Sequence, residues 1–168
     1  MRFAGSLVWI LFLFFFQIAA QGIFFDQTPS FVLIGVIFFA LSRGPMNGFL
    51  AGLFGGFLID LLGIGKMGYE SMIFSCVGLI CGYLSTFLFR DSLWTQLTVP
   101  SLANYLVQLS SLLWFGRLAG RPFQWGIFVD AWNAPGVFLT FFLSPFVFLF
   151  LRKATGLRPS GVKGTKSV

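Results

Sequence analysis

The stretch Gly48-Phe-Leu-Ala-Gly52-Leu-Phe-Gly-Gly56-Phe-Leu-Ile-Asp60 carries a glycine or an aspartate at every fourth position. Residues four apart lie on one face of a helix, so these four residues form one edge of the helix predicted over 46–62. Glycine destabilises helices in water. Within a bilayer, however, small residues at this spacing let a neighbouring helix approach closely. The stretch therefore predicts a membrane-spanning helix on whose glycine edge other helices converge.

Asp60 is the only acidic residue well inside an apolar run. A carboxylate is costly among hydrocarbon chains, and it usually faces protein or water rather than lipid. Two interpretations stay open at this point. Asp60 is either a polar cap at the end of a helix or a group with a specific functional role.

The composition indicates a polytopic helical membrane protein. Of 168 residues, 57% are hydrophobic and only 10% are charged, 25 are Phe, and the mean hydropathy is +0.90. The net charge of +6 comes largely from basic residues after the last apolar run, namely Arg152, Lys153, Arg158, Lys163 and Lys166. Such a tail favours an orientation signal and a contact for anionic lipid headgroups over a nucleic-acid partner.

Six apolar segments are predicted to be helices, within one transmembrane domain over 1–151. Their ranges are 3–20, 29–42, 46–62, 71–89, 93–115 and 131–151, followed by a basic tail over 152–168. The first is expected to be a retained helix rather than a cleaved signal peptide, because no cleavage site follows it. The core of the second, 30–41, would rise only about 18 Å, against a hydrocarbon core of about 30 Å. Whether it fully spans is left open.

A second row of small residues is predicted to pack against the first. Ser71, Ser75, Gly78 and Gly82 lie along the segment 71–89, so it should form an antiparallel hairpin with 46–62. The expected helix-packing and partner-binding residues are Gly48, Gly52, Gly56, Asp60, Ser71, Ser75, Gly78 and Gly82.

Polar side chains mark the last two segments. Asn104 and Gln108 lie on one face of the fifth, which also contains Pro100, and Asn133 lies at the start of the sixth, which contains Pro145. Both prolines are expected to kink their helices. The polar residues are expected in the interior, either in hydrogen bonds between helices or lining a cavity for a small solute.

The distribution of basic residues predicts the orientation. With six spans, eight basic residues fall on one side, counting Arg2, Arg43, Arg90 and the five in the tail. The other side receives three, which are Lys66, Arg117 and Arg121. The positive-inside bias therefore places both termini in the cytoplasm.

No catalytic, cofactor-binding or metal-binding site is expected, so the sequence does not indicate an enzyme. The chain has no histidine and no paired carboxylates within its apolar runs, and its two cysteines, Cys76 and Cys81, are five residues apart on one helix. Three functions remain: a non-catalytic scaffold, a small-solute binding subunit of a transporter, and a channel.

The order of motifs resembles the MreD family of integral-membrane proteins of the bacterial rod-shape machinery. The resemblance rests on the Gly48-to-Asp60 run with Gly63 and Gly68, on Phe89-Arg90-Asp91, on Trp132-Asn133, and on Ser144-Pro145-Phe146 in the last helix. It implies an all-α fold similar to the substrate-capture subunits of energy-coupling-factor transporters. It also implies a multi-pass protein of the bacterial cytoplasmic (inner) membrane with no enzymatic activity.

The same resemblance implies specific partners in cell-wall elongation. MreC would bind directly, and MreB, RodA and the penicillin-binding transpeptidase would associate through that complex. The fold similarity also keeps the solute-binding alternative open. Against transport, the first segment lacks the Ala-x-x-x-Ala stripe by which substrate-capture subunits dock their energising partner.

Overall fold

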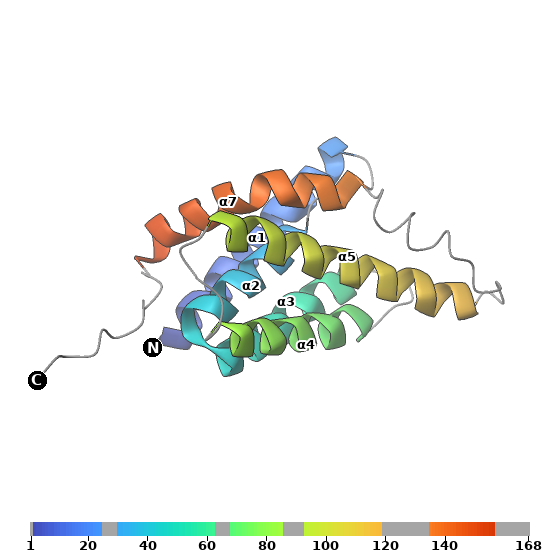
Figure 1. The fold of residues 1–168 in the computed structure, drawn as a ribbon, viewed down its shortest axis with the longest axis horizontal. Coiled ribbons are helices and arrows are strands. Elements are labelled where there is room, and N and C mark those ends of the chain that lie inside the picture. Colours follow the sequence, from blue (N-terminus) through green and yellow to red (C-terminus); the bar gives the residue numbers. More distant parts are fainter. Residues whose placement is uncertain (1, 25–29, 63–67, 86–92, 119–134, 157–168) are drawn as a thin grey trace, which may run out of the picture.

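A computed structural model of the chain describes residues 2–24, 30–62, 68–85, 93–118 and 135–156. These residues form six α-helices and contain no β-strand, which confirms the predicted all-α class (Figure 1). The helices are α1 (Arg2–Phe24), α2 (Phe31–Arg43), α3 (Pro45–Leu62), α4 (Tyr69–Leu84), α5 (Leu93–Leu118) and α7 (Pro135–Thr155).

Three helices continue past their predicted ends. α1 extends to Phe24, so the connection predicted over 21–28 is wrong in its first four residues, and α5 extends to Leu118 rather than 115. α7 ends at Thr155, so the first four residues of the predicted tail are helical. Arg152 and Lys153 lie in its last turn, where cations interact favourably with the helix dipole.

The turns around α3 and α4 are shorter than predicted. The predicted ranges 29–42 and 46–62 leave residues 43–45 between them, but only Gly44, with φ 90°, separates α2 from α3. α4 begins at Tyr69 instead of 71 and ends at Leu84. The predicted helical residues 86–89 and 131–134, together with Pro29, lie outside the described residues. The helix runs without a break through Pro100 in α5 and through Pro145 in α7.

The short second segment is the core helix of the bundle. All eleven residues from Phe31 to Leu41 are buried, and α2 contacts α1, α3, α4, α5 and α7. A helix that is apolar on every side is stable only when it is surrounded. This segment is short for a membrane span, and its place among the other helices is that of a core helix (Figure 1).

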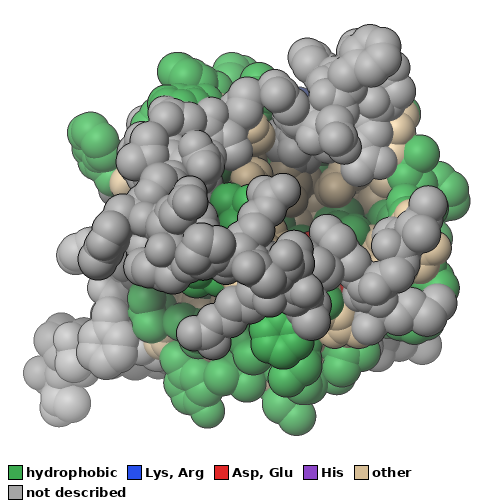
Figure 2. Space-filling view, turned by 90° about the vertical axis from the view of Figure 1, so that its right-hand side faces the viewer, with side chains coloured by type: hydrophobic (Ala, Val, Ile, Leu, Met, Phe, Trp, Pro, Cys, Tyr) green, Lys and Arg blue, Asp and Glu red, His purple; other side chains and the backbone are tan. Residues whose placement is uncertain are grey.

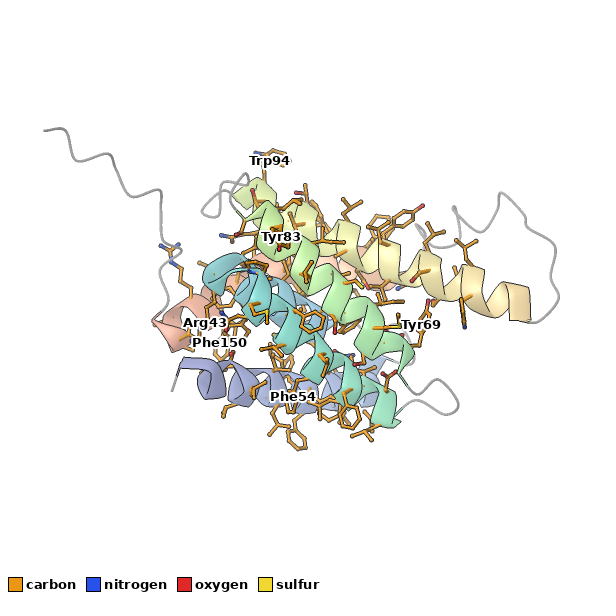
Figure 3. The ribbon with its side chains drawn as sticks, turned by 90° about the horizontal axis from the view of Figure 1, so that it is seen from below. Arg43, Phe54, Tyr69, Tyr83, Trp94 and Phe150 are labelled. Carbon is orange, nitrogen blue, oxygen red and sulfur yellow. The ribbon has the colours of Figure 1, made fainter. Side chains whose placement is uncertain are left out.

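Successive helices alternate in direction, so the start of α1 and the end of α7 lie at the same end of the bundle (Figure 1). At this end Arg43 donates a hydrogen bond from Nη1 to Ser6 Oγ at 3.1 Å, and the rings of Trp9 and Phe150 are 5.8 Å apart. Figure 3 shows Arg43 and Phe150 together there, with Tyr69 at the opposite end. Because Arg43, Arg152 and Lys153 all lie there, we refer to it as the basic end.

Large apolar side chains cover the outside of the bundle. The exposed stripe of α3 is Met46, Leu50, Leu53, Phe57 and Leu61, and that of α7 is Phe138, Phe142, Phe146, Leu149 and Phe150. Phe146 is 73% exposed and Trp94 is 74% exposed, whereas Asp60 and Asn104 are each 3% exposed. Figure 2 shows hydrophobic side chains around the rim of one face, with non-hydrophobic atoms recessed between them.

Two described helices are long and apolar enough to cross a membrane, over Pro45–Leu62 and Gly136–Thr155. Only 33% and 28% of these stretches is buried within the bundle. Shorter apolar helical stretches of 10–17 residues lie over Gly5–Ala20, Phe31–Arg43 and Tyr69–Leu84.

Candidate functional site: the glycine seam and its aspartate

The antiparallel pairing of α3 with α4 is confirmed, and the two helices meet backbone to backbone. Gly48 faces Gly78, and the position that a Cβ would take on either glycine overlaps the carbonyl of the other. Gly52 lies against Phe74 and Ser75, where an added Cβ would overlap the Phe74 carbonyl and lie 2.8 Å from the Ser75 nitrogen. We call this contact the glycine seam.

The seam continues to both ends of the hairpin. A Cβ on Gly56 would lie 2.6 Å from both the backbone carbonyl oxygen of Glu70 and the backbone nitrogen of Ser71. A Cβ on Gly82 would lie 2.6 Å from the nitrogen of Pro45, at the start of α3. Close approach is therefore required along the whole length of both helices.

Two serines of the seam use their hydroxyls within the bundle. Ser71 Oγ donates to the Leu53 carbonyl oxygen across the seam at 3.1 Å, and Ser75 Oγ donates to the Ser71 carbonyl oxygen at 2.7 Å. The small residues predicted as a surface for partners thus contact each other in this structure. A partner helix would have to bind on another face.

Asp60 caps the amino terminus of α4 from the last turn of α3. Its Oδ1 accepts a hydrogen bond from the Glu70 backbone N–H at 3.1 Å, and its Oδ2 accepts one from the Ser71 N–H at 2.9 Å. Gly68 precedes the helix with φ 90° and has no side chain to provide a cap. Since the first N–H groups of a helix have no partner within it, the carboxylate satisfies two otherwise unpaired donors. Of the two interpretations of Asp60, the geometry supports the polar cap.

A second cap of the same kind joins α1 to α2, and it was not predicted from the sequence. Gln17 is buried, and its Oε1 accepts a hydrogen bond from the Val32 backbone N–H at 3.1 Å. Ser30, which precedes α2, makes no side-chain capping bond. The sequence feature that could have indicated this cap is an amide toward the end of an apolar helix. The next helix follows after a short connection.

The predicted polar stripe of α5 holds α7 in place. Asn104 is buried and donates from Nδ2 to Thr140 Oγ1 at 2.9 Å and to the Gly136 carbonyl oxygen at 3.2 Å. Ser144 Oγ, one turn further along α7, donates to the Gln96 carbonyl oxygen at 2.7 Å. Both described amide donors of Asn104 are therefore directed at α7 rather than at an open cavity.

The other two predicted interior residues differ from Asn104. Gln108 is half-buried on α5, and its backbone carbonyl oxygen accepts a bond from Ser111 Oγ at 2.8 Å. Asn133 lies outside the described residues. The structure thus brings the seam residues together between α3 and α4, with Asp60 at one end, and it places Asn104 on the separate interface between α5 and α7.

A tyrosine at the start of α4 contacts α5. Tyr69 donates from its hydroxyl to Ser110 Oγ at 3.1 Å, and its ring centroid is 6.3 Å from that of Trp114 (Figure 3). Tyr69 directly precedes Glu70, whose backbone N–H is capped by Asp60. The end of the bundle around Asp60 is therefore fixed to α5 as well as to α3.

The chemistry available at the site is structural. Asp60 and Glu70 are the carboxylates within the described residues, and no group of three or more potential metal ligands occurs among them. Cys76 is exposed and Cys81 is buried, both on α4. Comparison with protein-family models, with curated proteins and with solved structures found no match to this chain.

Proposed function

We propose that the chain is a polytopic membrane protein whose six helices cross the bilayer with both termini in the cytoplasm. The outward-facing apolar surface carries this proposal, because large side chains such as Phe146 and Trp94 are exposed while Asp60, Asn104 and the glycines of the seam are buried. Exposed apolar surface on this scale needs lipid or a partner to cover it. The caps from Asp60 and Gln17 support it too, since hydrocarbon offers no water to satisfy a helix terminus.

The arrangement of the helix ends supports the orientation. Alternating directions bring the start of α1, the end of α2 and the end of α7 to the basic end. Positive charge near helix ends favours the cytoplasmic side. The basic end is therefore assigned to the cytoplasm and the Asp60 end to the opposite side.

Within the membrane the protein acts as a non-catalytic scaffold of the bacterial cell-elongation machinery. This role comes from the resemblance of its motifs to the MreD family, with MreC as the direct partner and MreB, RodA and the penicillin-binding transpeptidase as indirect ones. The use of Asp60 and Asn104 in contacts within the chain is consistent with a scaffold. The glycine seam forms the hairpin, and the exposed apolar faces are left for partner helices.

Co-purification with MreC tests this function. The full-length chain, extracted in mild detergent, should capture MreC without any added small molecule. Asn104→Ala should leave capture unchanged and lower the melting temperature only slightly, because hydrogen bonds between membrane helices average about 0.6 kcal/mol. Ser111→Ala, which removes a hydroxyl bonded to its own helix, is the matched control.

The opposite outcome would favour the solute-binding alternative. In that case MreC is not captured, and a vitamin-like solute raises the melting temperature of the unmodified chain but not of Asn104→Ala. Such a result would contradict the scaffold function.

A further inference from the structure

A small crevice opens at the basic end where the end of α2, the start of α5 and the end of α7 meet. Its volume is about 20 Å³. The apolar walls come from Phe38, Phe148 and two leucines, and the polar wall comes from Ser42, Gln96 and Arg152. None of these residues contributes to the glycine seam or to the Asn104 contact.

Gln96 lines this crevice, and its side-chain oxygen has no hydrogen-bond partner in the described part of the chain. The residue is only 8% exposed, and its side-chain Oε1 is shielded from solvent with no hydrogen-bond donor among the described residues. An unpaired buried carbonyl oxygen is destabilising, since it has lost its bonds to water and gained none in return. The site therefore lacks a donor that a bound molecule could supply.

The size and the charge of the crevice limit what that molecule can be. A cavity of about 10–15 Å³ holds one water-sized group, so the crevice accepts a single hydroxyl or ammonium group rather than a whole solute. Arg152 brings a guanidinium, which binds phosphate oxygens through paired N–H donors. Because a guanidinium has five N–H donors, it can bind a phosphate together with its contacts to the protein.

We propose that this crevice binds the headgroup of an anionic phospholipid, with phosphatidylglycerol as the occupant. The phosphate lies on Arg152, a glycerol hydroxyl donates to Gln96 Oε1 once the Gln96 side chain turns this oxygen toward the crevice, and the acyl chains follow the exposed apolar stripe of α7. The neighbouring charges of Arg43 and Lys153 favour a net negative lipid. This proposal depends on the membrane location and not on the scaffold function, so each can fail without the other.

Lipid retention by the purified full-length chain tests the site. After exchange into detergent containing phosphatidylglycerol or phosphatidylcholine, native mass spectrometry counts the lipid that stays bound. Phosphatidylcholine carries a phosphate but no O–H or N–H donor in its headgroup. We expect about tenfold better retention of phosphatidylglycerol, which is the size of the gain when an unpaired buried acceptor receives a hydrogen bond. Equal retention of both lipids would overturn the proposal.

Substitutions of two neighbouring basic residues on α7 distinguish a specific lipid site from general electrostatic attraction of anionic lipid. Arg152→Gln and Lys153→Gln each remove one positive charge from the same helical turn, but only Arg152 lines the crevice. We expect Arg152→Gln to lose about tenfold in retention and Lys153→Gln to lose almost nothing. An equal loss of lipid retention in both variants would show only general electrostatic attraction and would contradict the proposed site.

Gln96→Met tests the unsatisfied carbonyl itself. Methionine has a similar length and no polar atom to leave unpaired, so the variant should melt at a higher temperature in lipid-free detergent. It should also lose most of the preference for phosphatidylglycerol over phosphatidylcholine. A lower melting temperature with the preference intact would show that water already satisfies Oε1, and free glycerol 3-phosphate competing as well as the lipid would show a soluble ligand. Either outcome overturns the lipid assignment.

Discussion

A single methyl group added at Gly52 is expected to lower the melting temperature sharply and to separate α3 from α4. The Cβ of Gly52→Ala would overlap the carbonyl of Phe74 and lie 2.8 Å from the nitrogen of Ser75. These are backbone atoms of a packed helix, so they cannot move aside as a side-chain tip can. Overpacking of this kind costs about 1–3 kcal/mol, and more where nothing can relax.

Two other glycines provide matched controls for that substitution. Gly5 in α1 has no atom within 4 Å of an added Cβ, so Gly5→Ala should be neutral or slightly stabilising, because alanine is the better helix former. Gly35 in α2 faces only the end of the Leu13 side chain, and Gly35→Ala should have an intermediate effect. Melting curves in one detergent measure all three. Equal effects at Gly52 and Gly5 would show that the seam is not closely packed.

Asp60→Leu is expected to have the second large effect. Leucine removes both acceptors and leaves the Glu70 and Ser71 N–H groups without the partners that they have at 3.1 and 2.9 Å. An unsatisfied buried donor costs about 1–3 kcal/mol. Asp60→Asn keeps one oxygen acceptor of the two, so it should retain more stability and more activity in a cell-shape complementation assay.

The cap on α2 gives a control for the aspartate. Gln17→Leu leaves one N–H without its partner, that of Val32, so its effect should be smaller than that of Asp60→Leu. If Asp60→Leu and Asp60→Asn both behave as the unmodified chain, the carboxylate is only a solvated residue at a helix end. That result would contradict the capping role.

Local spacing predicted the parts of the fold that depend on one helix or on two adjacent ones. The four-residue repeat from Gly48 to Asp60 fixed a helical edge, and the small residues from Ser71 to Gly82 fixed its partner, because a short connection brings the two together first. The pairing of α3 with α4 followed from these two patterns. The six helices among the described residues followed from the apolar segments between polar turns.

The parts that depend on several helices could not be predicted in this way. Segment 30–41 looked too short for a span, and only the contacts of α2 with five other helices show that it is the core. Gln17 and Gln96 are both amides in largely apolar helices, yet the side-chain oxygen of one is a cap and that of the other is unsatisfied. Spacing along the chain does not distinguish them, because their partners come from helices far away in the sequence.

The proposed function and the proposed lipid site both depend on the location of the bundle in a membrane. The accessibility of two positions in intact cells tests this location most directly. In a chain whose own cysteines are replaced by Cys76→Ser and Cys81→Ser, a single cysteine is introduced by Lys66→Cys, between α3 and α4, or by Lys166→Cys, in the tail. An impermeant thiol reagent is applied before and after permeabilisation of the inner membrane.

We expect membrane-bound protein in which Lys66→Cys reacts in intact cells and Lys166→Cys reacts only after permeabilisation. The reason is that six alternating helices place these two positions on opposite sides of the bilayer, with the basic tail inside. Reaction of both positions from the same side, or recovery of the protein in the soluble fraction, would contradict the account.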